Sequence, residues 1–310
     1  MKKTDKILVT GAKGLVGSAL VEYLKAQGFE NIIEVGRDNC DLVSTQDTRY
    51  FFEQHSPDYV FHAAARVYGI MGNMKNKALS FYDNVMINTN VVDASCRVGV
   101  KKITVMGTGA VYPYPSPALP LQEDMIFMGE PHGAEDSYAH AKRAMLAMLK
   151  AYQESYNLEW AYIVSCNLFG MRDKFDTEFG HVVPSLIKKF YDAKKAGTSV
   201  VVWGDGSAQR DFMYVKDTAR VALQIMEKVN GPVNIGSGTV FKIRDIVEMI
   251  ADIAGMSDKV EWDASKPNGQ DYRAYDLAKI NAIDFSCQYS IRDGLEETWL
   301  WYEKTAGVQA

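Results

Sequence analysis

Three glycines spaced as G-x-x-G-x-x-G follow an apolar, β-branched run near the start of the chain and precede a helical pattern. In such a strand-turn-helix unit the first glycine permits a sharp turn, the second lets the backbone approach a pyrophosphate, and the third lets the helix pack closely. We therefore favour a dinucleotide-binding loop over a plain tight turn. The residues assigned to it are Gly11, Lys13, Gly14, Leu15, Val16 and Gly17.

The first half of the chain alternates apolar runs with amphipathic stretches. Buried parallel strands are predicted over residues 7–10, 32–35, 59–63, 103–106 and 161–164, with helices over 15–24 and 138–152. This order predicts an α/β fold with a Rossmann-type doubly wound parallel sheet. The pattern loosens after residue 165, where a strand over 200–203 and a helix over 243–253 are expected. We predict an NADP-binding Rossmann domain over 1–165 and a smaller C-terminal α/β substrate-binding region over 166–310, interleaved with it.

Composition narrows the class of protein. The net charge of −5 and the pI of about 5.6 disfavour nucleic acid as a partner. No run approaches eighteen apolar residues, so no membrane span is expected. The four cysteines are far apart and give neither a zinc motif nor a disulfide framework, and no histidine pair has metal-ligand spacing. That spacing gives no reason to expect a bound metal. Because the charged start does not resemble a leader segment, the chain is expected to be cytoplasmic.

Two cations indicate which dinucleotide binds. Lys13 lies inside the glycine loop and Arg37 just past the second predicted strand, where either can pair with a 2′-phosphate. Glu34 is the competing feature, because an acidic residue near that strand end can hold a ribose 2′-hydroxyl instead. We favour NADP over NAD. Asp41 either contacts the adenine amine or is a solvated loop residue, and the sequence leaves both open.

Tyr138 and Lys142 stand at i and i+4, on one face of a predicted helix. A phenol with a pKa near 10 is a poor acid at neutral pH, and a neighbouring ammonium favours the phenolate and so lowers that pKa. Thr108 follows the fourth predicted strand and supplies a hydroxyl. Combined with the glycine loop, this set predicts an acid-base site beside a nicotinamide. His62, within a strand, is expected to be a core or cofactor-wall residue.

At this point the chain resembles the extended short-chain dehydrogenase/reductase family of sugar-nucleotide epimerases, dehydratases and reductases, and within it the GDP-L-fucose synthase type of epimerase-reductase. The resemblance covers nearly the whole chain. It is carried by the segments 63–67 (AAARV), 69–70 (GI), 107–113 (GTGAVYP), 167–170 (NLFG), 180–184 (GHVVP), 202–206 (VWGDG), 210–212 (RDF), 266–269 (KPNG) and 294–299 (GLEETW).

The resemblance implies a role for each matching residue. Thr108 would hydrogen-bond the sugar carbonyl, Tyr138 would donate the proton, and Lys142 would lower the tyrosine pKa and hold the nicotinamide ribose. His181 matches the general acid of epimerisation. The cofactor site would include Ala63, Ala64 and Ala65 together with Tyr138 and Lys142, and the nucleotide-sugar contacts would be Asn167, Val182, Lys189, Trp203, Arg210 and Arg273. A homodimer through helices over 85–96 and 138–152 is also implied.

One departure bears on the reaction. Fucose synthases carry Ser-Ser-Cys before Ile-Tyr-Pro, whereas this chain reads Thr108-Gly109-Ala110, and a methyl group cannot act as the epimerisation base. The interpretation we favour is NADPH-dependent reduction at C4 of a 4-keto-6-deoxy sugar linked to a nucleotide, with GDP as the preferred nucleotide. This reaction would serve deoxysugar biosynthesis for surface polysaccharide. The alternatives are a bifunctional 3,5-epimerase/4-reductase of the fucose synthase type and a non-catalytic NADP-binding sensor.

Overall fold

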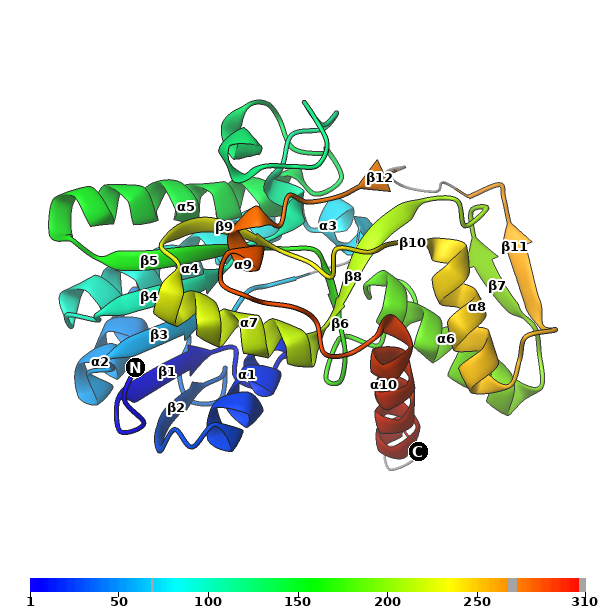
Figure 1. Cartoon of the computed structure of the whole chain (residues 1–310), viewed down its shortest axis with the longest axis horizontal. Helices are drawn as coiled ribbons and strands as arrows, with labels where there is room; N and C mark the ends of the chain where they lie inside the picture. The colour runs from blue at the N-terminus through cyan, green and yellow to red at the C-terminus, as the bar shows by residue number, and fades with distance from the viewer. Residues whose placement is uncertain (68–69, 267–271, 307–310) are drawn as a thin grey trace.

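A six-stranded parallel sheet forms the centre of the larger region in the computed structural model (Figure 1). The structure describes residues 1–67, 70–266 and 272–306. The strand order is β2-β1-β3-β4-β5-β9, with β1 Lys6–Thr10, β2 Asn31–Val35, β3 Tyr59–His62, β4 Lys102–Met106, β5 Glu159–Ser165 and β9 Gly231–Ile235. Central strand residues such as Ile7, Leu8 and Ile103 are fully buried, as a sheet covered on both faces requires. The Rossmann-type prediction is confirmed.

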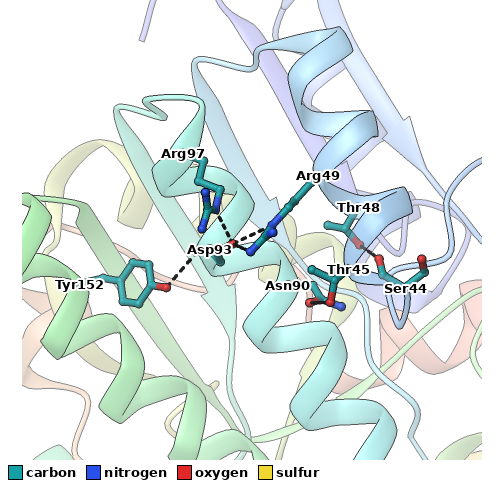
Figure 2. Close-up of polar contacts among 8 residues, drawn as sticks. All are labelled: Ser44, Thr45, Thr48, Arg49, Asn90, Asp93, Arg97 and Tyr152. Atoms are coloured by element: carbon teal, nitrogen blue, oxygen red, sulfur yellow. Dashed lines mark hydrogen bonds and ion pairs between the residues drawn. The ribbon is translucent and has the colours of Figure 1, made fainter.

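Two groups of helices cover this sheet (Figure 1). In one group α1 (Leu15–Ala26) packs on α7 (Val215–Lys228), and in the other α4 (Lys77–Arg97) packs on α2 (Thr45–His55) and α5 (Asp136–Tyr156). Asp93 ties the second group together, because its carboxylate accepts hydrogen bonds from Arg49 at 2.9 Å, Arg97 at 2.7 Å and Tyr152 at 3.2 Å (Figure 2). α5, which carries the predicted acid-base pair, is thereby fixed to α4.

The sixth strand, β9, was not among the strands predicted from the sequence. It pairs with β5 in parallel register from Ala161 opposite Gly231 to Ser165 opposite Ile235. Its apolar run is short and opens on Gly231-Pro232, which by themselves favour a turn. The central sheet therefore takes one strand from the second half of the chain.

The smaller region lies beyond the carboxyl ends of the central strands (Figure 1). One sheet has the order β10-β8-β12, with β6 also paired to β8, and a second sheet pairs β7 with β11. The strands are β6 Asn167–Phe169, β7 Val200–Trp203, β8 Gln209–Tyr214, β10 Val240–Lys242, β11 Val260–Asp263 and β12 Tyr272–Arg273. The remaining helices are α3 Ile70–Lys75, α6 Val182–Ala196, α8 Ile243–Ala254, α9 Ala278–Asn281 and α10 Ile291–Ala306, with short 3₁₀ turns η1 Gly109–Val111 and η2 Glu123–Phe127.

The predicted strand over 200–203 and helix over 243–253 are confirmed as β7 and α8. Within the described residues, no helix is both long enough and apolar enough to span a membrane.

Candidate active site

The glycine loop joins β1 to α1 through a backbone that other residues could not adopt. Gly11 has φ of +67°, and a Cβ atom there would lie 2.9 Å from backbone atoms of Ala64. A Cβ atom on Gly17 would lie 2.1 Å from the carbonyl oxygen of Gly11, so the third glycine packs the helix on the loop itself. Gly14 begins α1 without a side-chain capping bond. This cradle fits a dinucleotide pyrophosphate, which would meet the N-terminus of α1.

A chain of hydrogen bonds runs from this loop to α5. The backbone N–H of Ala64 donates to Thr10 Oγ1 at 3.1 Å, and the Thr10 hydroxyl lies 2.7 Å from His62 Nδ1. His62 Nε2 lies 3.0 Å from Asn88 Oδ1, and Asn88 Nδ2 donates to the Ala141 carbonyl at 3.4 Å.

His62 is a neutral link in that chain. It is fully buried, and burial, helped by the charge of Lys142, lowers its pKa to about 3. In the neutral ring Nε2–H donates to Asn88 Oδ1, so Nδ1 has no hydrogen and accepts from the Thr10 hydroxyl. The donor and the acceptor of every hydrogen bond in the chain are thereby fixed. The predicted core or cofactor-wall role of His62 is confirmed as a core position beside the loop.

The two cations predicted to select NADP, Lys13 and Arg37, lie near the end of β2. Arg37 is exposed, and Lys13 is exposed and pairs with Asp38 at 2.8 Å. Glu34 is held by Lys25 of α1 at 2.7 Å, which occupies the one acidic side chain that argued for NAD. Asp41 accepts a hydrogen bond from the Val43 backbone at 3.0 Å and so fixes a turn. Its predicted contact with adenine stays a prediction.

Tyr138 and Lys142 project from α5 into the protein. The ammonium of Lys142 lies 5.9 Å from the centre of the Tyr138 ring and donates to the Met106 carbonyl at 2.8 Å. Lys142 is 1% exposed and Tyr138 9%, so burial lowers the pKa of Lys142 to about 7 and raises that of Tyr138.

One expectation about this helix is corrected by the structure. The predicted lowering of the Tyr138 pKa by Lys142 is not found in the protein alone, because burial of the phenol and the charge of Glu135 both raise that pKa. Arg143, the residue after Lys142, is also buried, at 7% exposure, and donates to the Val111 carbonyl at 2.8 Å. That bond fixes the segment after β4 to α5.

Thr108 follows β4 and caps η1. Its hydroxyl oxygen accepts the Ala110 backbone N–H at 3.2 Å, which leaves the hydroxyl hydrogen for another acceptor. Ala110 is buried at 4% exposure, so the position where fucose synthases carry the cysteine holds a methyl group packed inside the protein.

His181 precedes the first residue of α6 and pairs with a buried carboxylate. Its Nδ1 lies 3.6 Å from Asp173 Oδ1, with the imidazole 45% exposed and the aspartate 6% exposed. Partial desolvation lowers the pKa of His181, but the negative charge of Asp173 outweighs that effect, and the pKa is raised. An exposed, protonatable imidazole held by an aspartate can deliver a proton.

Four of the six predicted nucleotide contacts form two pairs in the smaller region. Arg210 of β8 lies opposite Arg273 of β12. Guanidinium groups bind phosphate oxygens, so two of them on neighbouring strands suit an anionic ligand. The Lys189 ammonium lies 5.1 Å from the exposed Trp203 ring. Asn167 lies in β6 opposite Phe212, and Val182 is exposed in the first turn of α6. Residues 69 and 267–269 of the quoted segments lie outside the described residues.

Sequence and structure comparisons place the chain among known proteins. The model of the NAD dependent epimerase/dehydratase family matches residues 7–236. The chain belongs to this family. GDP-L-fucose synthase 1 of Arabidopsis thaliana is 36% identical over 305 residues, covering 97% of this chain and 94% of that relative.

Two solved structures show how close the likeness of fold is. A GDP-6-OMe-4-keto-L-xylo-heptose reductase from C. jejuni superposes with a TM-score of 0.91 at 29% identity, covering 98% of this chain and 99% of that one. A GDP-mannoheptose C4 reductase from Campylobacter jejuni with NADP bound has a TM-score of 0.87 at 30% identity, with the same coverage. These members of the epimerase/dehydratase family have nearly the same length as this chain.

Several residues that shape the site were missed by sequence reasoning. Asp173 could have been predicted as a partner of His181, because it is an acidic residue shortly after the Asn167 segment in the loop that leads to His181. The sequence gives no such indication for Asn88 or Tyr275. Their contacts, with His62 and Gly109 respectively, join segments far apart in the chain. In the described part of the chain no group of three His, Cys, Asp or Glu side chains could hold a metal ion.

Proposed function

We propose that this chain is an NADPH-dependent reductase that acts on C4 of a GDP-linked 4-keto-6-deoxy sugar. The observation that carries the proposal is the grouping at the end of β4. Lys142 binds the carbonyl of Met106, two residues before Thr108, and lies beside the Tyr138 ring. Two hydroxyl donors and one ammonium thus gather where the strand leaves the sheet, which is where ligands bind in doubly wound folds.

NADPH, when bound, supplies the hydride. Thr108 and Tyr138 donate hydrogen bonds to the ketone oxygen, and Tyr138 releases its proton to that oxygen as negative charge forms on it. The raised pKa of Tyr138 in the protein alone opposes release of this proton. The negative charge that forms on the substrate oxygen and the ammonium form of Lys142 offset that effect when substrate is bound. Lys142 also offers its remaining N–H groups to the nicotinamide ribose.

The substrate class is supported by the smaller region and by the relatives. The paired Arg210 and Arg273 suit a diphosphate, and the exposed face of Trp203 suits a base or ribose. Relatives and structural neighbours are GDP-L-fucose synthases and GDP-heptose C4 reductases, which supports guanine as the base.

One observation favours a second candidate, the bifunctional epimerase-reductase. His181 keeps its carboxylate partner, Asp173, so one of the two groups that inversion needs is in place. Ala110 cannot supply the other, because a methyl group takes no proton. We therefore place reduction first.

We further propose a homodimer through α4 and α5 and a cytoplasmic location. Phe81 and Tyr82 near the start of α4 are 44% and 58% exposed, and Tyr156 near the end of α5 is 63% exposed, so both ends of this helix pair present aromatic side chains that a second copy could cover. Asp93 already fixes the two helices to each other (Figure 2). All four cysteines are free thiols, which suits a reducing compartment. Sedimentation velocity tests the dimer, and Met86→Glu on α4 should produce monomers.

The reaction is tested by NADPH oxidation, followed at 340 nm, over a panel of GDP- and dTDP-linked 4-keto hexoses and heptoses. We expect turnover with a GDP-linked 4-keto sugar and its loss in Tyr138→Phe. Tight NADPH binding without oxidation by any member of the panel would favour the non-catalytic sensor instead.

A further inference from the structure

The hydroxyl of Tyr275 lies against the backbone of Gly109, the residue after Thr108. A Cβ atom on residue 109 would lie 2.0 Å from this oxygen, so the hydroxyl can occupy this position only because residue 109 is glycine. The Tyr275 backbone is fixed beside Leu121 by two hydrogen bonds of 2.9 Å, from Leu121 N to the Ala274 carbonyl and from Asp276 N to the Leu121 carbonyl. The ring is 7% exposed. A phenol from the smaller region thus reaches the segment that carries the catalytic threonine.

This hydroxyl is a buried polar group still in need of an acceptor. Within the described part of the chain it makes no hydrogen bond of normal geometry, although Arg273 approaches it and with its charge opposes the effect of burial. Burial dominates and raises the pKa of Tyr275 to about 12, so the phenol stays neutral and keeps its hydrogen. Tyr112, by contrast, is equally buried but donates to Asn234 Oδ1 at 2.6 Å. Buried donors are normally satisfied, so a ligand is the expected partner.

We propose that Tyr275 is a specificity-determining residue whose hydroxyl donates a hydrogen bond to the C3 hydroxyl of the 4-keto sugar. The inference rests on the proposed function, in which Thr108 contacts the C4 oxygen. Groups next to Thr108 then face the ring positions next to C4. Of these, C5 carries a carbon substituent in a hexose or heptose, and C3 carries the hydroxyl. Gly109 and Ala110, both without functional side chains, leave this place to Tyr275.

The contact has a chemical consequence for selectivity. A site built to hydrogen-bond a substrate hydroxyl discriminates against an analogue that lacks it, because the buried protein group is then left unpaired. The neutral phenol of Tyr275 is also a poor base, so it can hold the C3 hydroxyl without replacing the missing cysteine. The same residue would therefore recognise the sugar and leave C3 uninverted.

The experiment compares two substrates in three proteins. The substrates are a GDP-linked 4-keto-6-deoxyhexose and its 3-deoxy analogue, and the proteins are wild type, Tyr275→Phe and Tyr112→Phe. We expect Tyr275→Phe to lower kcat/KM for the C3-hydroxyl substrate about tenfold, mostly through KM, and to leave the 3-deoxy analogue nearly unchanged. Tyr112→Phe should lower the Tm without changing the ratio between the two substrates. Gly109→Ala should reproduce the loss of selectivity, because its methyl group displaces the Tyr275 hydroxyl.

Calorimetry separates failure of this inference from failure of the proposed function. Wild type should bind the GDP-linked 6-deoxyhexose product, with Tyr275→Phe weakening that binding about tenfold and leaving the Kd of GDP alone unchanged. Equal losses for both substrates, or no loss, would overturn the role of Tyr275 while reduction stands. Wild-type protein that neither binds nor reduces the GDP-linked sugar would overturn both.

Discussion

The ammonium of Lys142 lies 2.8 Å from the carbonyl oxygen of Met106, the last residue of β4. This bond joins the first third of α5 to the carboxyl end of β4, two residues before Thr108, and so holds Lys142 and Tyr138, one helical turn before it, beside that strand end. Both side chains are buried there, and burial is the main cause of the shifts in their pKa values.

Tyr138→Phe should reduce kcat by about 10²- to 10⁴-fold, the usual range for loss of a general acid. The glycine loop is separate from the phenol, so the Kd of NADPH measured by fluorescence should stay within twofold, roughly. Tyr156→Phe, at the exposed end of the same helix, is the matched control. Full turnover in Tyr138→Phe would remove this tyrosine from the mechanism.

Lys142 should make the cofactor-free protein more stable as the pH rises above 7. Its pKa is about 7 in the folded protein against the usual 10.5 for a lysine, so between these pH values the unfolded chain binds more protons than the folded one. The free energy of unfolding then rises with pH, by up to about 1.4 kcal/mol per pH unit for one group. Below pH 7 both states are charged and this dependence ends.

Urea unfolding at pH 7, 8 and 9 measures that effect. Lys142→Met should flatten the rise, whereas Lys150→Met, exposed on the same helix, should leave it in place. An identical slope in wild type and Lys142→Met would show that folding does not lower the pKa of Lys142.

Arg37→Ala should weaken NADPH binding and spare NADH. A charge-assisted bond to the 2′-phosphate contributes about 1.5 to 3 kcal/mol, which corresponds to a loss of roughly 10- to 150-fold. Lys101→Ala is the control, because that exposed cation pairs with Asp58 at 2.7 Å just before β4 and has no place in the predicted cofactor site. If Arg37→Ala kept the full preference for NADPH, selection would have to rest on Lys13 or another group.

Asp173→Asn should lower the pKa of His181, because the carboxylate is what raises it. NMR titration of the imidazole measures the shift directly. Any step that needs protonated His181 should then fail at a lower pH in the variant than in wild type. Asp176→Asn, which removes a carboxylate that only accepts backbone N–H groups at 2.7 and 2.8 Å in the same loop, should leave the titration unchanged.

The nucleotide-binding half of the fold could be predicted because its signals are local. Strand periodicity, the glycine spacing and the i, i+4 pair each depend on residues close in sequence, and β1 to β5 appear where they were expected. Strand β9 was not predicted, because its first residues, Gly231-Pro232, favour a turn. Its place in the sheet is set by pairing with β5, which the sequence pattern does not show.

The protonation states of the site could not be predicted in the same way. Spacing puts Tyr138 and Lys142 on one face, but only the packing around α5 shows that both are desolvated, which reverses the expected direction of the tyrosine pKa. The contact of Tyr275 with Gly109 joins residues far apart in the chain and depends on the absence of a side chain. No pattern in one sequence reports such a contact.

The most direct test of reduction without inversion is a single reaction in D₂O. Protein, NADPH and a GDP-linked 4-keto-6-deoxyhexose are incubated together, and the product is followed by NMR. We predict one NADPH oxidised per product, a protium from the cofactor at C4, and C3 and C5 unchanged in configuration, with at most slow exchange at one carbon through His181. Rapid deuterium incorporation at both C3 and C5 with inverted product would contradict this account and make the epimerase-reductase the main function.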